Sequence, residues 1–274
     1  MNYRHAFHAG NFADCFKHAL LVALLDNLAR KPTPFCVMDT HAGSGRYDLS
    51  ADAAQRTAEA EGGILRLLSN RDGAGPLASY LGLVTQLGLY PGSPMIIRAL
   101  LRPGDRLVCC EKQPEEAAAL KRLFRHDPQV EVHARSGWEA LGALLPPREK
   151  RGLVFIDPPF EARDEFTTLV AALKTGHARF SHGIHAAWYP VKQLAAVHGF
   201  HADMKASGLR DVVTIEMHLR DPVGSERLNG CGMLVINPPY RFTDIARTLV
   251  EAVLEGLGTA EPGAGVHVLR LADE

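Results

Sequence analysis

Short aliphatic and β-branched runs alternate along this 274-residue chain with longer segments in which apolar residues recur every three or four positions. Runs of the first kind are typical of buried strands, and the longer segments are typical of helices. The pattern predicts strands at residues 35–39, 106–111, 130–134, 153–157, 183–189, 212–218 and 231–236. It predicts helices at residues 14–30, 114–124, 136–145, 165–174 and 243–256. Strands that alternate with helices form βαβ units, so we expect an α/β fold with a seven-stranded, mostly parallel sheet.

Residues 49–99 interrupt this alternation. The stretch is rich in Ala, Leu and Glu and is broken by glycine and proline clusters at residues 73–76 and 91–94. We interpret it as a small helical insertion within a single domain that spans residues 1–274. A further strand-like run lies near the end, at residues 266–271.

The composition is that of an ordinary folded protein. Hydrophobic residues make up 46% of the chain and charged residues 22%, which excludes a largely disordered chain. The five cysteines form no CxxC pair and show no zinc spacing, so we expect reduced thiols and no metal. The start of the chain lacks the apolar region of a signal peptide, and no apolar run reaches the length of a membrane span. We therefore expect a cytoplasmic protein with no membrane partner.

The formal net charge is −1, so the chain as a whole does not attract a polyanion. Binding of nucleic acid would need local basic patches. Such clusters are more often solvated faces than binding sites. The candidate clusters are Lys121, Arg122 and Arg125; Arg148, Lys150 and Arg151; and Arg4 with Lys17.

The most informative motif is Asp157-Pro158-Pro159-Phe160, which directly follows the apolar run 153–156. A planar amino nitrogen, like N6 of adenine, becomes nucleophilic when hydrogen-bond acceptors hold its protons. Asp157 supplies such an acceptor, the prolines direct nearby carbonyls into a cleft, and Phe160 offers a face on which a base can stack. The alternative is that the prolines merely end a strand.

A glycine-bearing turn follows the first predicted strand, in the sequence Asp39-Thr40-His41-Ala42-Gly43-Ser44-Gly45. Gly43 and Gly45 would let the backbone approach a ligand closely, at the carboxyl edge where open α/β sheets bind ligands. The turn is neither the dinucleotide fingerprint nor a P-loop, which disfavours hydride and phosphoryl transfer. A tight βα connection without a ligand is the alternative.

Two further strand ends carry groups that suit an adenosine ligand. Glu111 ends the strand 106–111, where its carboxylate can receive ribose hydroxyls, although glutamates at strand ends are common. Ser136 and Gly137 follow the strand 130–134, where small residues can flank an adenine ring. With the glycine turn and Asp157, four consecutive strands end in functional groups at one edge of the sheet.

Two alternative sites also need to be considered. Asn237-Pro238-Pro239-Tyr240 follows another apolar strand and repeats the Pro-Pro pattern, but it comes after the last predicted strand, beyond the cleft. We therefore expect a structural turn there. His5 and His8 could suggest a metal site, yet no carboxylate or cysteine lies at a suitable spacing.

The convergence at one edge resembles the class I S-adenosylmethionine-dependent methyltransferases, in which DPPY or DPPF marks the group that methylates amino nitrogens. More closely, the chain resembles the bacterial ribosomal RNA large-subunit methyltransferase J family. The residues that carry this resemblance are 3–11 (YRHAFHAGN), 13–18 (ADCFKH), 39–43 (DTHAG), 90–94 (YPGSP), 151–153 (RGL), 188–191 (WYPV), 232–233 (GM) and 237–239 (NPP).

The resemblance implies methylation of an adenine N6 in 23S rRNA with S-adenosyl-L-methionine as cofactor. Asp157 would be the catalytic carboxylate, supported by Pro158 and Phe160. Arg4 and Phe160 would contact the RNA, and a monomer would act on naked or partly assembled 23S rRNA. The expected cofactor-binding residues are Lys17, His18, His41, Gly43, Ser93, Glu111, Ser136, Gly137 and Asp157.

The chain departs from the family pattern at two places. Family members often have Asp-Gly where this chain has Ser136-Gly137, and DPPY where it has Phe160. The first difference puts the side-chain contact at Ser136 in question, and the second removes a hydroxyl but keeps the ring. Three alternatives remain: a DNA adenine methyltransferase, a protein glutamine methyltransferase, and an RNA-binding module of the same fold without catalysis.

Overall fold

The computed structural model describes residues 8–50, 59–70, 75–162, 164–224, 227–258 and 261–273. Its main feature is an eight-stranded sheet with the strand order β10-β8-β9-β7-β6-β1-β4-β5. The strands of this sheet are β1 (Cys36–Asp39), β4 (Arg106–Glu111), β5 (Val130–Ala134), β6 (Gly152–Ile156), β7 (Ile184–Val191), β8 (Val212–His218), β9 (Gly230–Ile236) and β10 (Gly265–Ala272). A separate two-stranded pair joins β2 (Arg46–Tyr47) to β3 (Tyr90–Pro91).

The sheet is parallel from β5 to β7 and antiparallel beyond. β1 pairs in parallel with both β4 and β6, whereas β9 runs antiparallel to its neighbours β7 and β8. The expected α/β class is confirmed, with eight strands rather than seven. The additional strand is β10, which includes the run at residues 266–271 and pairs antiparallel with β8.

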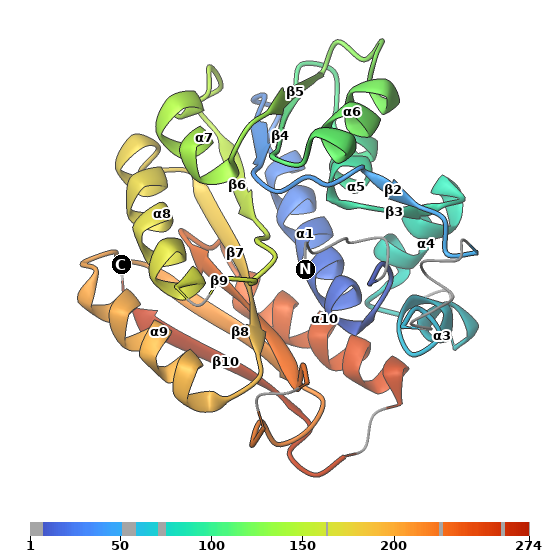
Figure 1. The fold of residues 1–274 in the computed structure, drawn as a ribbon, viewed down its shortest axis with the longest axis vertical. Helices are drawn as coiled ribbons and strands as arrows, with labels where there is room; N and C mark the ends of the chain where they lie inside the picture. Colours follow the sequence, from blue (N-terminus) through green and yellow to red (C-terminus); the bar gives the residue numbers. More distant parts are fainter. Residues whose placement is uncertain are drawn as a thin grey trace.

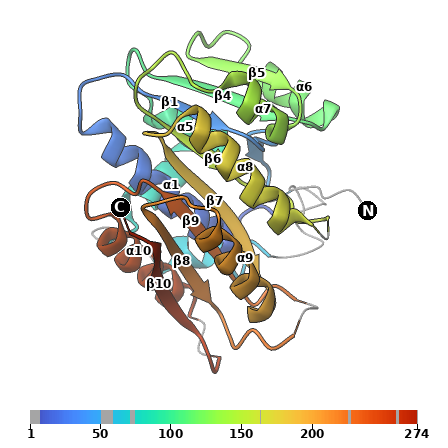
Figure 2. The same ribbon diagram turned by 90° about the vertical axis from the view of Figure 1, so that its left-hand side faces the viewer.

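Helices cover both faces of the sheet (Figures 1 and 2). The first face packs against α7 (Gly137–Leu144), α8 (Glu165–Arg179) and α9 (Leu194–Ala206). The second packs against α1 (Phe12–Ala29), α5 (Ser93–Leu100), α6 (Pro114–Leu123) and α10 (Phe242–Leu257). Helix α9 was not predicted, although its buried residues Val197, Phe200, His201 and Met204 have helical spacing.

Helix α1 is buried on nearly all sides, because apolar residues surround it between the sheet, α5 and α10. It begins at Asn11, whose side chain accepts a hydrogen bond from the Asp14 amide (3.0 Å). Asp14 in turn accepts from the Gly10 amide (2.9 Å), so the first turn is capped from both directions. The helix ends before the exposed loop at residues 30–34, which leads into the amino end of β1. Its first turns therefore lie at the opposite edge, near the carboxyl ends of the parallel strands.

The segment predicted to be a helical insertion, residues 49–99, contains α3 (Ile64–Ser69) and α4 (Ala78–Leu87) in its described part. The Ile64 amide donates to the Gly10 carbonyl (2.8 Å), which ties this segment to the start of α1. Helix α5, at the end of the predicted insertion, contacts β1 and β4 and belongs to the helical layer on the sheet. None of the described helices combines the length and apolar character that crossing a membrane requires.

Candidate active site

The carboxyl ends of β1, β4, β5 and β6 meet at one edge of the sheet because these strands are parallel. Asp39 ends β1, Glu111 ends β4, Ser136 follows β5 and Asp157 follows β6. The structure thus brings together the four strand ends whose convergence the sequence predicts. This edge holds the candidate active site.

Asp157 lies in a short chain of charges with helix α1. The Lys17 ammonium donates to Asp157 Oδ2 (2.6 Å) and lies 2.8 Å from Asp14 Oδ1. Their side chains are only 3–14% exposed, so solvent screens these ion pairs poorly. Lys17 reaches Asp157 because the first turns of α1 lie at this edge. Lys17, which was predicted to contact the cofactor, is therefore bonded to the Asp157 carboxylate in this structure.

Asp39 is a fully buried carboxyl at the same edge. Its Oδ1 accepts from the His41 amide (3.3 Å), while Oδ2 has no hydrogen bond within the described part of the chain. Burial raises the pKa of Asp39 to about 7; the Ser93 hydroxyl and Lys17 oppose this rise, and the Asp157 charge adds to it. These influences place Ser93, Lys17 and Asp157 around the buried carboxyl.

The glycine turn after β1 needs its glycines. Gly43 has φ +60°, and a Cβ there would lie 2.3 Å from the Tyr47 hydroxyl; at Gly45, with φ +88°, it would lie 2.8 Å from Leu120. The Gly43 amide donates to Glu111 Oε2 (2.9 Å). Glu111 therefore closes the turn, and its carboxylate lies at the carboxyl edge of the sheet.

His41 lies between the turn and the start of α7. Its Nδ1 is 2.8 Å from the Thr40 hydroxyl, and its ring meets the edge of Trp138 at 4.7 Å. Burial lowers the pKa of His41 to about 3, so the ring is neutral near pH 7. Gly137 permits this close approach, because a Cβ there would lie 2.0 Å from the Thr40 carbonyl. Ser136 precedes α7 without capping it through its side chain.

A cluster of aromatic side chains, which we call the aromatic corner, lies beside Asp157 and consists of Phe160, Phe166 and Trp188. Phe160 adopts a left-handed backbone with φ 50°, and its ring meets Phe166 (4.9 Å) and Trp188 (5.8 Å) edge to face. The Lys17 ammonium lies 5.9 Å from the centre of the Trp188 ring. A left-handed conformation is unfavourable for phenylalanine, so packing must hold it in place. The half-buried Phe160 and Trp188 form one wall next to the Asp157 carboxylate.

Two predicted residues lie elsewhere or outside the described chain. His18 is buried, and its Nδ1 lies 3.0 Å from the Tyr90 hydroxyl, which in turn lies 3.2 Å from that of Tyr80. This places His18 among residues of the insertion. Arg4, like His5, falls outside the described residues, so the structure says nothing about its contact with RNA.

The rival motif at Asn237 lies at the other edge of the sheet. Because β9 is antiparallel to β7, its end meets the amino end of β7. The side-chain amide of Asn237 donates hydrogen bonds to the backbone carbonyls of Ser181 (2.8 Å) and Gly183 (2.7 Å). A structural turn, as expected from the sequence, agrees with this geometry. The reason differs from the expected one. Asn237 lies away from the candidate site because β9 runs antiparallel, and β9 is an internal strand rather than the last one of the sheet.

The sequence interpretation missed Asp14, Asp39 and Trp188 as site residues. Asp14 follows the helix cap Asn11 by three positions, which is a recognisable start of a helix. Asp39 is the last residue of its strand and could have been found by the same argument as Glu111. Trp188 carried no signal of its own, because it lies within the apolar run of β7.

Comparison with known proteins agrees with this geometry. Residues 32–269 match the family model described as "RsmJ: Ribosomal RNA large subunit methyltransferase D, RlmJ". The chain belongs to this family. The match includes Asp39, Glu111 and Asp157, and it confirms the resemblance that the sequence motifs indicated.

Individual members of the RsmJ family match over most of their length. The protein named "Ribosomal RNA large subunit methyltransferase J" from Escherichia coli is 38% identical over 248 residues, covering 88% of this chain and 89% of that protein. The protein of the same name from Haemophilus influenzae is 38% identical over 247 residues, covering 88% of each chain. A crystal structure of a protein from Legionella pneumophila superposes with a TM-score of 0.85 at 35% identity, covering 96% of this chain and 98% of that one.

No described group of three or more His, Cys, Asp or Glu side chains has the arrangement of a metal site. The described ionisable groups at the carboxyl edge bond instead to one another and to backbone amides. Their arrangement suits an organic ligand with hydrogen-bond donors and a positive charge.

Proposed function

We propose that this protein transfers a methyl group from S-adenosyl-L-methionine to N6 of an adenine in 23S rRNA. The observation that carries this proposal is the position of Asp157. It follows β6 in a DPPF motif, is bonded to Lys17 and lies beside the aromatic corner of Phe160 and Trp188. The names of the Escherichia coli and Haemophilus influenzae relatives support a ribosomal RNA substrate.

The carboxyl edge fits S-adenosyl-L-methionine. Asp39 Oδ2 is a buried acceptor that lacks a donor among the described residues, which suits a cationic ligand with N–H groups. Gly43 and Glu111 would hold the ribose side, with Ser136 and Gly137 beside the adenine. His41 stays neutral and adds no positive charge near the ligand. The bound cofactor would supply an electrophilic methyl group on a sulfonium.

Asp157 would accept a hydrogen bond from the target amino group. Lys17 occupies Oδ2, so Oδ1 is the oxygen that would receive the amino proton. The amine need not lose a proton before attack, because the nitrogen becomes strongly acidic only as the new N–C bond forms. Asp157 can then take up that proton or pass it to solvent. Lys17 would orient the carboxylate during this step.

The target base must leave its stack to reach Asp157. Phe160 and Trp188 would receive the extruded adenine, and base stacking on an aromatic ring contributes about 1–3 kcal/mol. The wall is preformed by the packing of Phe160 against Phe166. We further propose that a cytoplasmic monomer acts on naked or partly assembled 23S rRNA, with Arg4 among its RNA contacts.

The decisive experiment measures transfer of labelled methyl groups to deproteinised 23S rRNA, to assembled large subunits, to DNA and to protein in parallel. We expect label in N6-methyladenine of rRNA, and an Asp157→Asn variant should lose about 100-fold or more of the rate. Asn237→Ala is the matched control, since Asn237 belongs to the Pro-Pro motif at the opposite edge. Label in DNA or protein alone, or unchanged transfer by Asp157→Asn, would overturn the proposal.

A further inference from the structure

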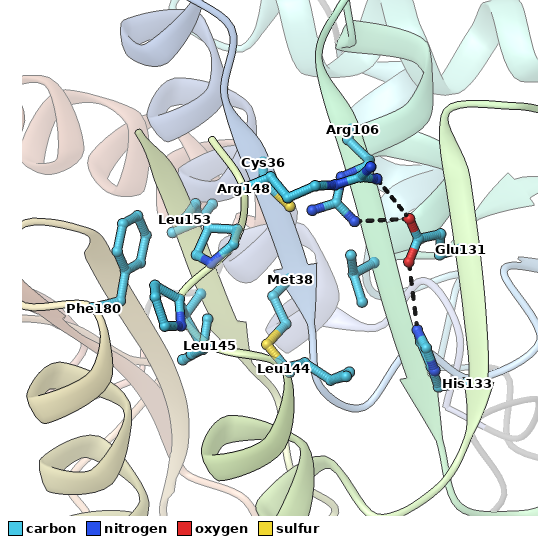
Figure 3. A pocket seen from close by; sticks show the side chains of 14 residues that line it. Cys36, Met38, Arg106, Glu131, His133, Leu144, Leu145, Arg148, Leu153 and Phe180 are labelled. Atoms are coloured by element: carbon cyan, nitrogen blue, oxygen red, sulfur yellow. Dashed lines mark hydrogen bonds and ion pairs between the residues drawn. The ribbon is translucent and has the colours of Figure 1, made fainter. Parts of the chain in front are cut away.

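A cavity of about 370 Å³ lies at the amino ends of β1, β4, β5 and β6 (Figure 3). Cys36 and Arg106 are the first residues of β1 and β4, and both line it, as do Leu153 of β6 and the connection from α7 to β6. Asp157 lies at the other end of β6. The cavity is therefore separate from the candidate active site, and nothing in the proposed reaction uses it.

One half of the cavity is polar and centres on Glu131. Its Oε1 accepts from Arg106 (2.9 Å) and lies 3.3 Å from Arg148, while Oε2 lies 3.7 Å from His133 Nε2 (Figure 3). The last distance is too long for a hydrogen bond, so the buried Nε2 atom of His133 makes no hydrogen bond with the described residues. The Arg148 side chain is 78% exposed. The rim thus offers a carboxylate, an imidazole and a solvent-facing guanidinium.

The other half is apolar. It includes the Phe180 ring and two prolines, whose flat surfaces suit the face of a planar ring. The apolar lining residues are Met38, Val108, Leu144, Leu145, Pro146, Pro147, Leu153, Val154 and Phe180. A nucleobase combines a flat apolar face with hydrogen-bonding edges, and proteins read unpaired RNA bases through both.

A second hollow of about 370 Å³ lies at the same edge of the sheet, on the face that α5 and α6 cover. It is lined by Arg98, Arg122, Arg125 and His126, with Asp127 bonded to Arg98. The segment 125–128 lines this hollow, and residues 131 and 133 line the first one. The two hollows lie on different faces of the sheet, with the start of β5 between their linings. Exposed cations thus stand at the same edge of the sheet as the first cavity.

The amino edge carries surplus positive charge although the chain has a net charge of −1. Carboxylates here are paired with arginines: Asp105 with Arg102, Asp127 with Arg98, and Glu149 with Arg106. The exposed side chains of Arg125 and Lys150 have no carboxylate partner among the described residues. A polyanion is therefore the partner that this edge fits by charge.

We infer that the amino edge is a second RNA contact of this enzyme, in which the cavity holds one unpaired nucleotide and Arg125 and Arg148 bind neighbouring phosphates. The inference rests on the proposed function, since the RNA is the methylation substrate. Its base lies on the apolar half, and Glu131 and His133 meet its hydrogen-bonding edge. The contact anchors the RNA away from the reacting adenine.

One RNA molecule can reach both sites. Leu153 in the cavity and Asp157 are four positions apart on β6 and its end, or about 13 Å at 3.3 Å per residue. A strand of B-form DNA rises about 3.4 Å per nucleotide and a strand of A-form RNA rises less, so about five nucleotides cover that distance. A stem with an unpaired nucleotide near the target is therefore long enough to occupy the cleft and the cavity together.

Arg148→Glu and His133→Ala test the inference, with Lys205→Glu as the control for reversed charge. Lys205 is exposed on α9, which packs near β10 at the far end of the sheet from β5. Methyl transfer to 23S rRNA should show a KM raised about tenfold in Arg148→Glu, with kcat changed less than about twofold. In Arg148→Glu, the slope of the logarithm of RNA affinity against the logarithm of salt concentration should become shallower by about one unit, because one phosphate contact is lost. Lys205→Glu should match the unsubstituted protein in KM, in kcat and in the salt dependence of RNA affinity.

Photocrosslinking with RNA that contains 4-thiouridine provides a readout that does not depend on activity. Crosslinks should map to residues 125–148 and disappear when the RNA is displaced by excess unlabelled 23S rRNA. No crosslink in this segment, or an unchanged KM in both variants, would refute the inference. So would saturable binding of adenosine monophosphate that both variants abolish while RNA kinetics stay normal, because the occupant would then be a free nucleotide. Absence of methyl transfer in the unsubstituted protein would instead refute the proposed function.

Discussion

Replacing Asp39 by asparagine tests whether the buried carboxyl beside the glycine turn is protonated in the folded protein without cofactor. Burial raises the pKa of Asp39 from 3.8 to about 7. The folded state therefore keeps a proton that the unfolded state has released, and the free energy of unfolding falls as pH rises between these two values. At 1.36 kcal/mol per pKa unit, the loss is about 4 kcal/mol once pH exceeds 7. Asparagine keeps the shape of the side chain and cannot ionise.

The assay is urea unfolding of both proteins without cofactor at a series of pH values from 5 to 8. Between pH 5 and pH 7, the free energy of unfolding of the unsubstituted protein should fall by about 2–3 kcal/mol relative to that of Asp39→Asn. Above pH 7 the difference between the two proteins should level off. The same variant should bind S-adenosyl-L-methionine more weakly, because it loses the carboxylate oxygen that has no donor in this structure.

Asp203→Asn provides the control, since Asp203 is exposed on α9 and the same substitution there should leave the pH dependence of stability unchanged. A stability difference between Asp39→Asn and the unsubstituted protein that stays constant from pH 5 to pH 8 would refute the reasoning. It would mean that Asp39 is already ionised at pH 5 despite its burial.

Three further predictions concern other residues. Lys17→Met should lower kcat for methyl transfer, because Asp14 and Asp157 would face each other without the ammonium that now holds the Asp157 carboxylate; an unchanged kcat would contradict this role. Gly43→Ala should weaken cofactor binding by about 1–2 kcal/mol, as measured by calorimetry. Adding Tyr47→Phe to this variant should recover part of the lost binding free energy, because it removes the hydroxyl with which the new Cβ clashes. Equal losses of binding with and without Tyr47→Phe would contradict this explanation. Glu216→Gln should destabilise the protein by about 2–3 kcal/mol at pH 7, because its buried carboxylate bonds to Tyr189 (2.8 Å) and His218 (2.9 Å). Hydrogen bonds from His201, His218 and Tyr189 hold the pKa of Glu216 well below its usual range, so the difference should be full above pH 4.5 and decrease as pH falls further; denaturant unfolding at pH 7 and pH 3 measures it.

The parallel half of the sheet could be predicted from the sequence because each strand is a short apolar run that ends in a distinctive residue. Strand direction could not be predicted in the other half. Hydrophobic periodicity is the same in both directions, so β9 was placed after the cleft rather than antiparallel between β7 and β8. Helix α9 was missed because alanine, glycine and histidine dilute its apolar spacing.

The site was predictable only where function follows directly from a strand end. Glu111 and Asp157 could be placed from topology alone, and the structure brings them to one edge. The bond between Lys17 and Asp157 joins residues 140 positions apart and depends on how α1 docks, which no local pattern specifies. The same holds for His18, whose partner Tyr90 is 72 positions away.

The burial of helix α1 has a consequence for how this protein becomes active during synthesis. Lys17 is synthesised 140 residues before its partner Asp157. The helix also packs between the sheet and α10, whose residues are synthesised after Asp157. A nascent chain that already holds the glycine turn and the DPPF motif would therefore still lack a docked lysine, and we expect methyl transfer to begin only after α10 has packed against α1.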